Sequence, residues 1–127
     1  MIPKIETSSV AEIKAFQEDK LQELLVYLQN HSPYYRELFL KNQNEISQIK
    51  TLEQLQNLPI TTKTDIQLNN DSFFCVPMNE IIDYATTSGT LGDPVTFGLT
   101  DNDLERLAYN EMISFQCAGI QKGDLVQ

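Results

Sequence analysis

The chain has 127 residues, enough for one modest domain with a core, and its 41% hydrophobic content is typical of a globular protein rather than a disordered one. Its formal net charge of −9 argues against nucleic acid and anionic membrane surfaces as partners, because both carry negative charge themselves. No apolar run approaches the roughly 20 residues that span a membrane, and two cysteines do not make a disulfide framework, so we expect a cytoplasmic protein.

Residues 9–70 carry the pattern of a helical layer. Ser9 followed by Glu12 forms a capping box and predicts the start of a helix that Asn30 can end. Apolar residues recur along this segment at roughly helical spacing and predict one apolar face: Val10, Ile13, Phe16, Leu21, Leu24, Leu25 and Leu28.

Three further helix starts follow in the same half of the chain. Ser32 is a good N-cap, and Pro33 has no N–H to lose at the first helical position, which together predict a helix to about Lys41. A capping box at 51–54 predicts a short helix, and Thr62 with Asp65 (62–65) predicts another turn or two. We interpret all of these as a packing layer without catalytic character.

The pattern changes near Ser72. Segments 73–76 and 81–84 look extended, and 95–97 reads as a further strand. Thr100, with an aspartate three residues on, caps a helix. That helix carries a set of apolar residues: Leu104, Leu107, Ala108, Met112 and Phe115.

The end of the chain reads as the beginning of another strand. Gly119 stands where a C-terminal cap glycine would, Gly123-Asp124 is a turn, and Leu125-Val126 looks extended. We therefore expect an α/β fold, with a helical layer over 9–70 and a strand–loop–strand–helix unit over 72–127. An incomplete sheet leaves an unpaired edge, so self-association into a homo-oligomer is expected.

The segment Thr87–Pro94, TSGTLGDP, is the most informative part of the sequence. Hydroxyl side chains and glycines of this kind offer hydrogen-bond donors to an anion and let a phosphate approach the main chain. The segment lacks the lysine of a Walker P-loop and the spacing of a dinucleotide fingerprint. A tight inter-strand turn rich in Ser, Thr and Gly is the alternative interpretation.

Other segments stand in a fixed order around this loop. They are Asn30–Phe39 (NHSPYYRELF), Leu58–Ile66 (LPITTKTDI), Val76-Pro77 with Glu80-Ile81, Asp101 with Leu104-Glu105, and Ala118-Gly119 with Gly123-Asp124. Together with the loop, they resemble the motifs of phenylacetate-CoA ligases, within the AMP-forming adenylating (acyl-CoA synthetase) superfamily. The resemblance runs from about residue 10 to the end of the chain. Several ordered matches are far more specific than one Gly-rich loop.

The resemblance implies a function for the loop. In that family the loop closes over the phosphates of ATP, the enzyme joins a carboxylate to AMP, and coenzyme A then takes up the acyl group. The implied ligands are thus ATP with Mg²⁺, a small carboxylic acid and coenzyme A. The implied nucleotide-binding residues are Thr87, Ser88, Gly89, Thr90, Leu91 and Gly92. On this basis 1–127 is the N-terminal part of an AMP-binding domain, expected to be inactive by itself.

Two residues depart from the family pattern. Leu91 stands where the family has a second threonine, and Asp93 adds a negative charge beside the loop. The family's Mg²⁺ carboxylate, ribose-binding aspartate and catalytic lysine come later than residue 127. We therefore assign no catalytic residue and no metal ligand within this chain.

The remaining polar candidates have structural interpretations. His31 is expected at a helix boundary, Lys63 in solvent, and Cys75 and Cys117 as buried apolar fillers. We expect a core position, rather than a ligand-stacking box, for the aromatic pairs 34–35 and 73–74 and for Phe115. The alternative to a ligase portion is a naturally short, non-catalytic relic that acts as a protein-interaction module.

Overall fold

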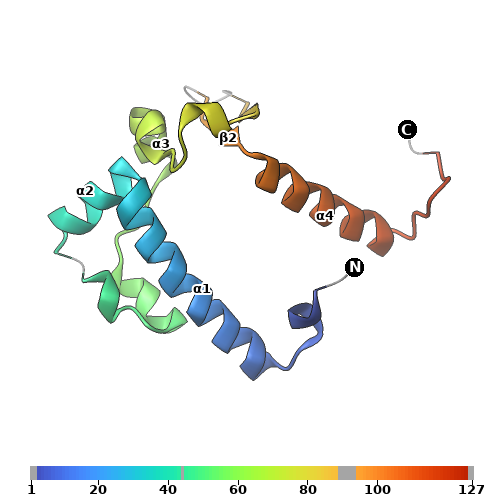
Figure 1. The fold of residues 1–127 in the computed structure, drawn as a ribbon, viewed down its shortest axis with the longest axis horizontal. Helices are drawn as coiled ribbons and strands as arrows, with labels where there is room; N and C mark the ends of the chain where they lie inside the picture. Colours follow the sequence, from blue (N-terminus) through green and yellow to red (C-terminus); the bar gives the residue numbers. More distant parts are fainter. Residues whose placement is uncertain (1–2, 44, 89–93, 126–127) are drawn as a thin grey trace. The chain divides into compact units, whose positions relative to one another are not determined.

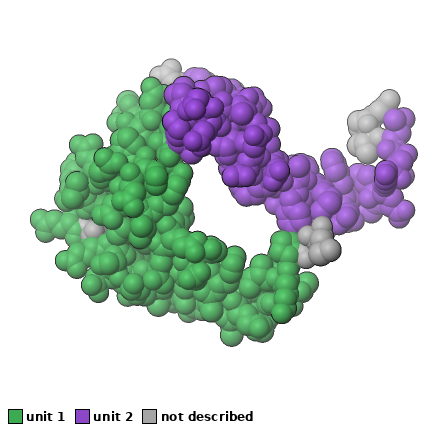
Figure 2. All heavy atoms as spheres, in the orientation of Figure 1, with its two compact units in different colours: residues 1–75 green, residues 76–127 purple. Residues whose placement is uncertain are grey.

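The computed structural model describes residues 3–43, 45–88 and 94–125 (Figure 1). The chain divides into two compact units, Met1–Cys75 and Val76–Gln127, which Figure 2 colours separately. The described part is rich in helix and contains one small antiparallel sheet of two strands. No helix of the described ranges is both long and apolar enough to cross a membrane.

The first unit is helical throughout. Its elements are η1 (Lys4–Thr7), α1 (Val10–His31), α2 (Pro33–Lys41), η2 (Ile46–Gln48), η3 (Leu52–Asn57), α3 (Lys63–Asn69) and η4 (Asn70–Phe73). The predicted caps are confirmed where the sequence placed them. Ser9 and Glu12 form the capping box of α1, and Ser32 accepts a hydrogen bond from the amide of Tyr35 at the start of α2. His31 is the last residue of α1.

The core of this unit is one cluster of five buried side chains. They are Leu21 and Leu25 from α1, Phe39 from α2, and Ile46 and Ile49 from the turn that follows. Leu28, Tyr35, Leu52 and Leu58 pack against the cluster from its edge. The helical period places residues 21, 25 and 28 on one face of α1, which is why this part of the predicted apolar face is covered.

Ser32 ties the corner between α1 and α2 to the end of the unit. Its side chain is fully buried, and its hydroxyl donates to the carbonyl of Ser72 at 3.1 Å. Nearby, the ring of Tyr34 stacks on Phe73 with centroids 4.0 Å apart. Tyr34, Tyr35 and Phe73 are half-buried rather than buried, and of the three only Tyr35 packs against the core cluster, at its edge.

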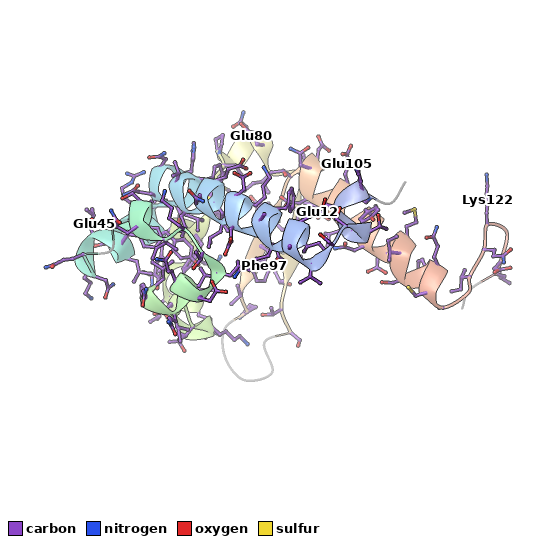
Figure 3. All side chains as sticks on the ribbon, turned by 90° about the horizontal axis from the view of Figure 1, so that it is seen from below. Glu12, Glu45, Glu80, Phe97, Glu105 and Lys122 are labelled. Atoms are coloured by element: carbon purple, nitrogen blue, oxygen red, sulfur yellow. The ribbon has the colours of Figure 1, made fainter. Side chains whose placement is uncertain are left out.

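The second unit consists of η5 (Met78–Glu80), β1 (Asp83–Thr86), β2 (Thr96–Leu99) and α4 (Asp101–Cys117). The two strands pair antiparallel in a register that sets Asp83 opposite Leu99 and Thr86 opposite Thr96. Phe97 of β2, labelled in Figure 3, lies opposite Ala85 and is 46% exposed. Gly119 follows α4 with a φ of 81°, the left-handed conformation expected of a helix-terminating glycine.

Several expectations about extension and burial are wrong. Segment 73–76 forms no strand, because Asn70–Phe73 closes a 3-10 helix. Three members of the predicted α1 face remain substantially exposed: Val10, Phe16 and Leu24. Phe115 and Cys117 are exposed on α4 instead of buried. The expected strand at 125–126 is absent at Leu125, and Val126 lies outside the described residues.

Candidate functional site

The candidate loop leaves the end of β1 and returns at the start of β2, as predicted for a loop between two strands. Of its predicted nucleotide-binding residues, Thr87 and Ser88 lie in the described part of the chain. The other four, Gly89, Thr90, Leu91 and Gly92, lie outside the described residues, as does Asp93. The geometry of the site is therefore the geometry of the loop's two ends.

Two hydrogen bonds join these ends. The amide of Thr87 donates to the carbonyl of Val95 at 3.0 Å, and the amide of Val95 donates to Oγ1 of Thr87 at 3.0 Å. Residue 87 is opposite residue 95 when the β1–β2 register is continued by one pair. The Thr87–Val95 pair thus closes the hairpin immediately below the loop.

Burial differs sharply across this closure. Val95 is only 2% exposed, Thr87 is half-buried, and Ser88 is exposed. Ser88 is therefore the first exposed residue of the loop and the first that a ligand can reach. Val95 anchors the returning end of the loop by its apolar side chain.

Two contacts hold the hairpin together at the end away from the loop. The amide of Ile82 donates to the carbonyl of Leu99 at 2.9 Å, which extends the pairing at the far end of the hairpin. Gly98 lies against Ile81, and a Cβ built on Gly98 would be 2.7 Å from the Cδ1 atom of Ile81. Only glycine fits at this position without a shift of that side chain.

The N-terminus of α4 follows β2 directly, and the amides of Thr100 and Asp103 there already have partners within the capping box. Thr100 Oγ1 accepts from the amide of Asp103, while the amide and hydroxyl of Thr100 both donate to Asp103 Oδ2. These hydrogen bonds from the main chain and side chain of Thr100, with a smaller effect of Arg106, lower the pKa of Asp103. The carboxylate occupies the place that an anionic ligand would take at this helix end.

The other polar candidates hold no site. Lys63 is exposed at the first turn of α3, as expected, and His31 stacks on Tyr27 with ring centroids 4.5 Å apart. Cys75 is partly buried, and burial raises the pKa of its thiol. Within the described residues, no three His, Cys, Asp or Glu side chains gather to hold a metal ion.

The bond from Val95 to the Thr87 hydroxyl is the feature that the sequence did not predict. The TSG pattern predicts Thr87 as a phosphate contact, and nothing local in the pattern indicates a main-chain partner for its hydroxyl. The strand register indicates this bond, because continuing the pairing of Thr86 with Thr96 by one residue places Thr87 opposite Val95.

Comparison with known proteins gives the chain clear relatives, although no family model matches it. It is 33% identical over 122 residues to the phenylacetate-coenzyme A ligase of Thermus thermophilus, which covers 95% of this chain and 27% of that protein. It is 32% identical over 127 residues to the enzyme of the same name from Pseudomonas putida, covering 99% of this chain and 29% of that protein. The chain therefore spans little more than a quarter of the length of these relatives.

Solved structures show the same relationship. An open conformation of 2-hydroxyisobutyryl-CoA ligase in complex with 2-HIB-AMP and CoA matches with a TM-score of 0.84 at 29% identity, over 96% of this chain and 29% of that one. The thioesterification state of the same ligase matches with a TM-score of 0.76 at 31% identity, over 85% of this chain and 24% of that one.

Proposed function

Because the chain is homologous to phenylacetate-coenzyme A ligases over about a quarter of their length, we propose that it forms the N-terminal part of an ATP-dependent, AMP-forming acid–CoA ligase. The substrate class is a small carboxylic acid, with an aryl acid such as phenylacetate as the first choice. A carboxylate oxygen attacks the α-phosphorus of ATP and pyrophosphate leaves. The thiol of coenzyme A then attacks the acyl carbon, and AMP leaves with the electrons of the broken bond.

The role of this chain in that reaction is to present the loop Thr87–Gly92 to the β- and γ-phosphates of ATP. Pyrophosphate develops negative charge as it leaves, and hydrogen-bond donors aimed at that charge stabilise the transition state. The observation that carries the proposal is the exposed residue Ser88, next in the chain to the Thr87–Val95 closure of the hairpin, within a chain of ordered family motifs. The 2-HIB-AMP and CoA held by the structural relatives support the same ligand classes.

No group of three or more His, Cys, Asp or Glu side chains gathers among the described residues, so no step is assigned to a metal held by them. A Mg²⁺ ion would arrive chelated to the nucleotide. No catalytic acid, base or nucleophile is assigned to this chain either.

The setting of the proposed reaction follows from its substrates. ATP and coenzyme A are cytoplasmic metabolites, and the net charge of −9 disfavours nucleic acid as a partner. We propose a cytoplasmic location and, because the sheet has two strands among the described residues, a tendency to self-associate.

The test is binding of ATP·Mg²⁺ to the chain by isothermal titration calorimetry. We expect saturable binding that is lost when Ser88→Ala and Thr90→Ala are combined. Ser114→Ala is the matched control, because it removes an exposed hydroxyl from α4, far along the chain from the loop. Binding that survives the double substitution would contradict the phosphate role, and no binding at all would favour the non-catalytic interaction module.

The hypothesis that the chain is part of an acid–CoA ligase is tested separately with a chimaera. This chain would replace the homologous quarter of the Thermus thermophilus ligase, and formation of phenylacetyl-CoA would be followed by loss of free thiol. Activity that depends on Ser88 and Thr90 in the chimaera is the expected result.

A further inference from the structure

The Thr87–Val95 pair departs from a regular antiparallel ladder in one of its two bonds. In a hydrogen-bonded antiparallel pair, each residue donates its amide to the main-chain carbonyl of the other. Thr87 follows this rule, since its amide donates to the carbonyl of Val95 at 3.0 Å. Val95 instead donates its amide to Oγ1 of Thr87 at 3.0 Å. A side chain has taken the place of a main-chain acceptor at the mouth of the loop.

Because the hydroxyl of Thr87 replaces a main-chain carbonyl as the acceptor, it has a geometric role. A β-branched side chain has few χ1 choices, so Oγ1 of Thr87 is a stiff acceptor. Its partner is equally fixed, because the side chain of Val95 is 2% exposed and held by packing. One hydrogen bond thus connects the residue that enters the loop to a buried residue that leaves it, and the span between them is set by that bond.

We propose that Thr87 is a positioning residue: its hydroxyl holds the amide of Val95 and so fixes the spacing of the loop ends, and it influences a bound nucleotide through that bond. This role rests on the proposed nucleotide-binding function for its effect on ATP, while the bond itself stands without it. The first position of the loop then differs in kind from Ser88, an exposed residue that is proposed to contact the ligand itself.

Hydrogen exchange of the Val95 amide tests the bond independently of any nucleotide. Thr87→Val keeps the shape of the side chain and removes the acceptor, while Thr87→Ser keeps the acceptor. We expect exchange at Val95 to be roughly tenfold faster in Thr87→Val and unchanged in Thr87→Ser. Thr86→Val makes the same chemical change one residue earlier, at an exposed position of β1, and serves as the matched control. Equal exchange in Thr87→Val and the unmodified chain would overturn the proposal.

An amide-to-ester replacement separates positioning from direct contact. Incorporating the α-hydroxy acid analogue of valine at residue 95 removes the N–H donor and leaves the Thr87 hydroxyl untouched. If Thr87 acts through Val95, the ester weakens ATP·Mg²⁺ binding by the same factor as Thr87→Val, and the two changes together do no more than either alone.

The two failures are distinguishable. If Thr87→Val weakened ATP·Mg²⁺ binding while the ester at residue 95 had no effect, Thr87 would touch the nucleotide directly. The positioning role would then be wrong. Absence of ATP binding in every form, with faster exchange at Val95 in Thr87→Val, would overturn the nucleotide function and the influence on ATP, and would leave the bond between Thr87 and Val95 established.

Discussion

Gly98 and Ile81 approach so closely that a side chain at residue 98 has no room: an added Cβ would lie 2.7 Å from Cδ1 and 3.2 Å from Cγ1 and Cγ2 of Ile81. The contact lies in the hairpin that carries the candidate loop. Three atoms of one side chain would have to move together, so a simple rotation of the terminal methyl does not relieve it.

We therefore expect Gly98→Ala to destabilise the chain by about 1–3 kcal/mol, the range typical of overpacking. The measurement is the free energy of unfolding in urea. Combining Gly98→Ala with Ile81→Ala opens the space, so the double variant should lose less than the sum of the two single losses. Additive losses would show that the clash is relieved elsewhere.

Ser32 offers a second test, in the first unit. Its buried hydroxyl donates to the Ser72 carbonyl and accepts from the Tyr35 amide. Ser32→Ala leaves both groups without this partner, and we expect a loss of about 1–3 kcal/mol in the free energy of unfolding. Ser47→Ala, at an exposed position of η2, should change it by less than about 0.5 kcal/mol. Equal effects of the two substitutions would contradict the assigned role.

Lys14 and Glu53 link α1 to η3 and predict a pH dependence. Lys14 Nζ lies 2.6 Å from Glu53 Oε1, and this hydrogen bond is the largest cause that lowers the pKa of Glu53 from 4.5 to about 2. Because the folded pKa is depressed, the stabilisation is present above the unfolded value near 4.5 and is lost as pH falls toward about 2. Both side chains are well exposed, so the effect on stability is small.

The direct measurement for this pair is a carboxyl carbon titration of Glu53 by NMR. We expect a midpoint near 2 in the unmodified chain and a higher midpoint in Lys14→Met. Lys63→Met removes an exposed lysine from another helix and should leave the midpoint unchanged. A midpoint of 4.5 in the unmodified chain would show that the pair does not form in solution.

The two thiols should react at different rates. Cys117 is exposed, whereas Cys75 is partly buried with a raised pKa, and the thiolate is the reactive form. Labelling with a thiol reagent at neutral pH should therefore show a fast and a slow phase. Cys117→Ser should remove the fast phase and Cys75→Ser the slow one, and two equal rates would refute the assignment.

The accuracy of the sequence predictions depends on how local the underlying physics is. Helix starts were predicted to the residue at Ser9, Ser32, Thr62 and Thr100, because a cap involves side chains and amides only three residues apart. Burial was predicted poorly at Phe115 and Cys117, because it depends on which distant segments cover a helix face. The apolar pattern of α4 does not indicate whether another segment of the described chain packs against its apolar face.

The same distinction applies to the candidate site. The strands on either side of the loop followed from short apolar runs, and the family motifs gave the loop its expected chemistry. The closure of its ends did not follow, since it depends on the partner that strand register brings opposite Thr87. The predicted nucleotide contacts of the loop residues stay a prediction: Thr87, Ser88, Gly89, Thr90, Leu91 and Gly92.

The buried cluster of the first unit draws all five members from residues 21 to 49 of the chain. Contacts between residues so near in sequence require only short loops to close, and such contacts form early. During synthesis this unit should therefore collapse as soon as η3 has left the ribosome, before the hairpin that carries the loop has emerged. Nascent chains arrested far enough beyond residue 75 for that residue to clear the exit tunnel should already resist proteolysis over α1 and α2, and full sensitivity there would contradict this order of folding.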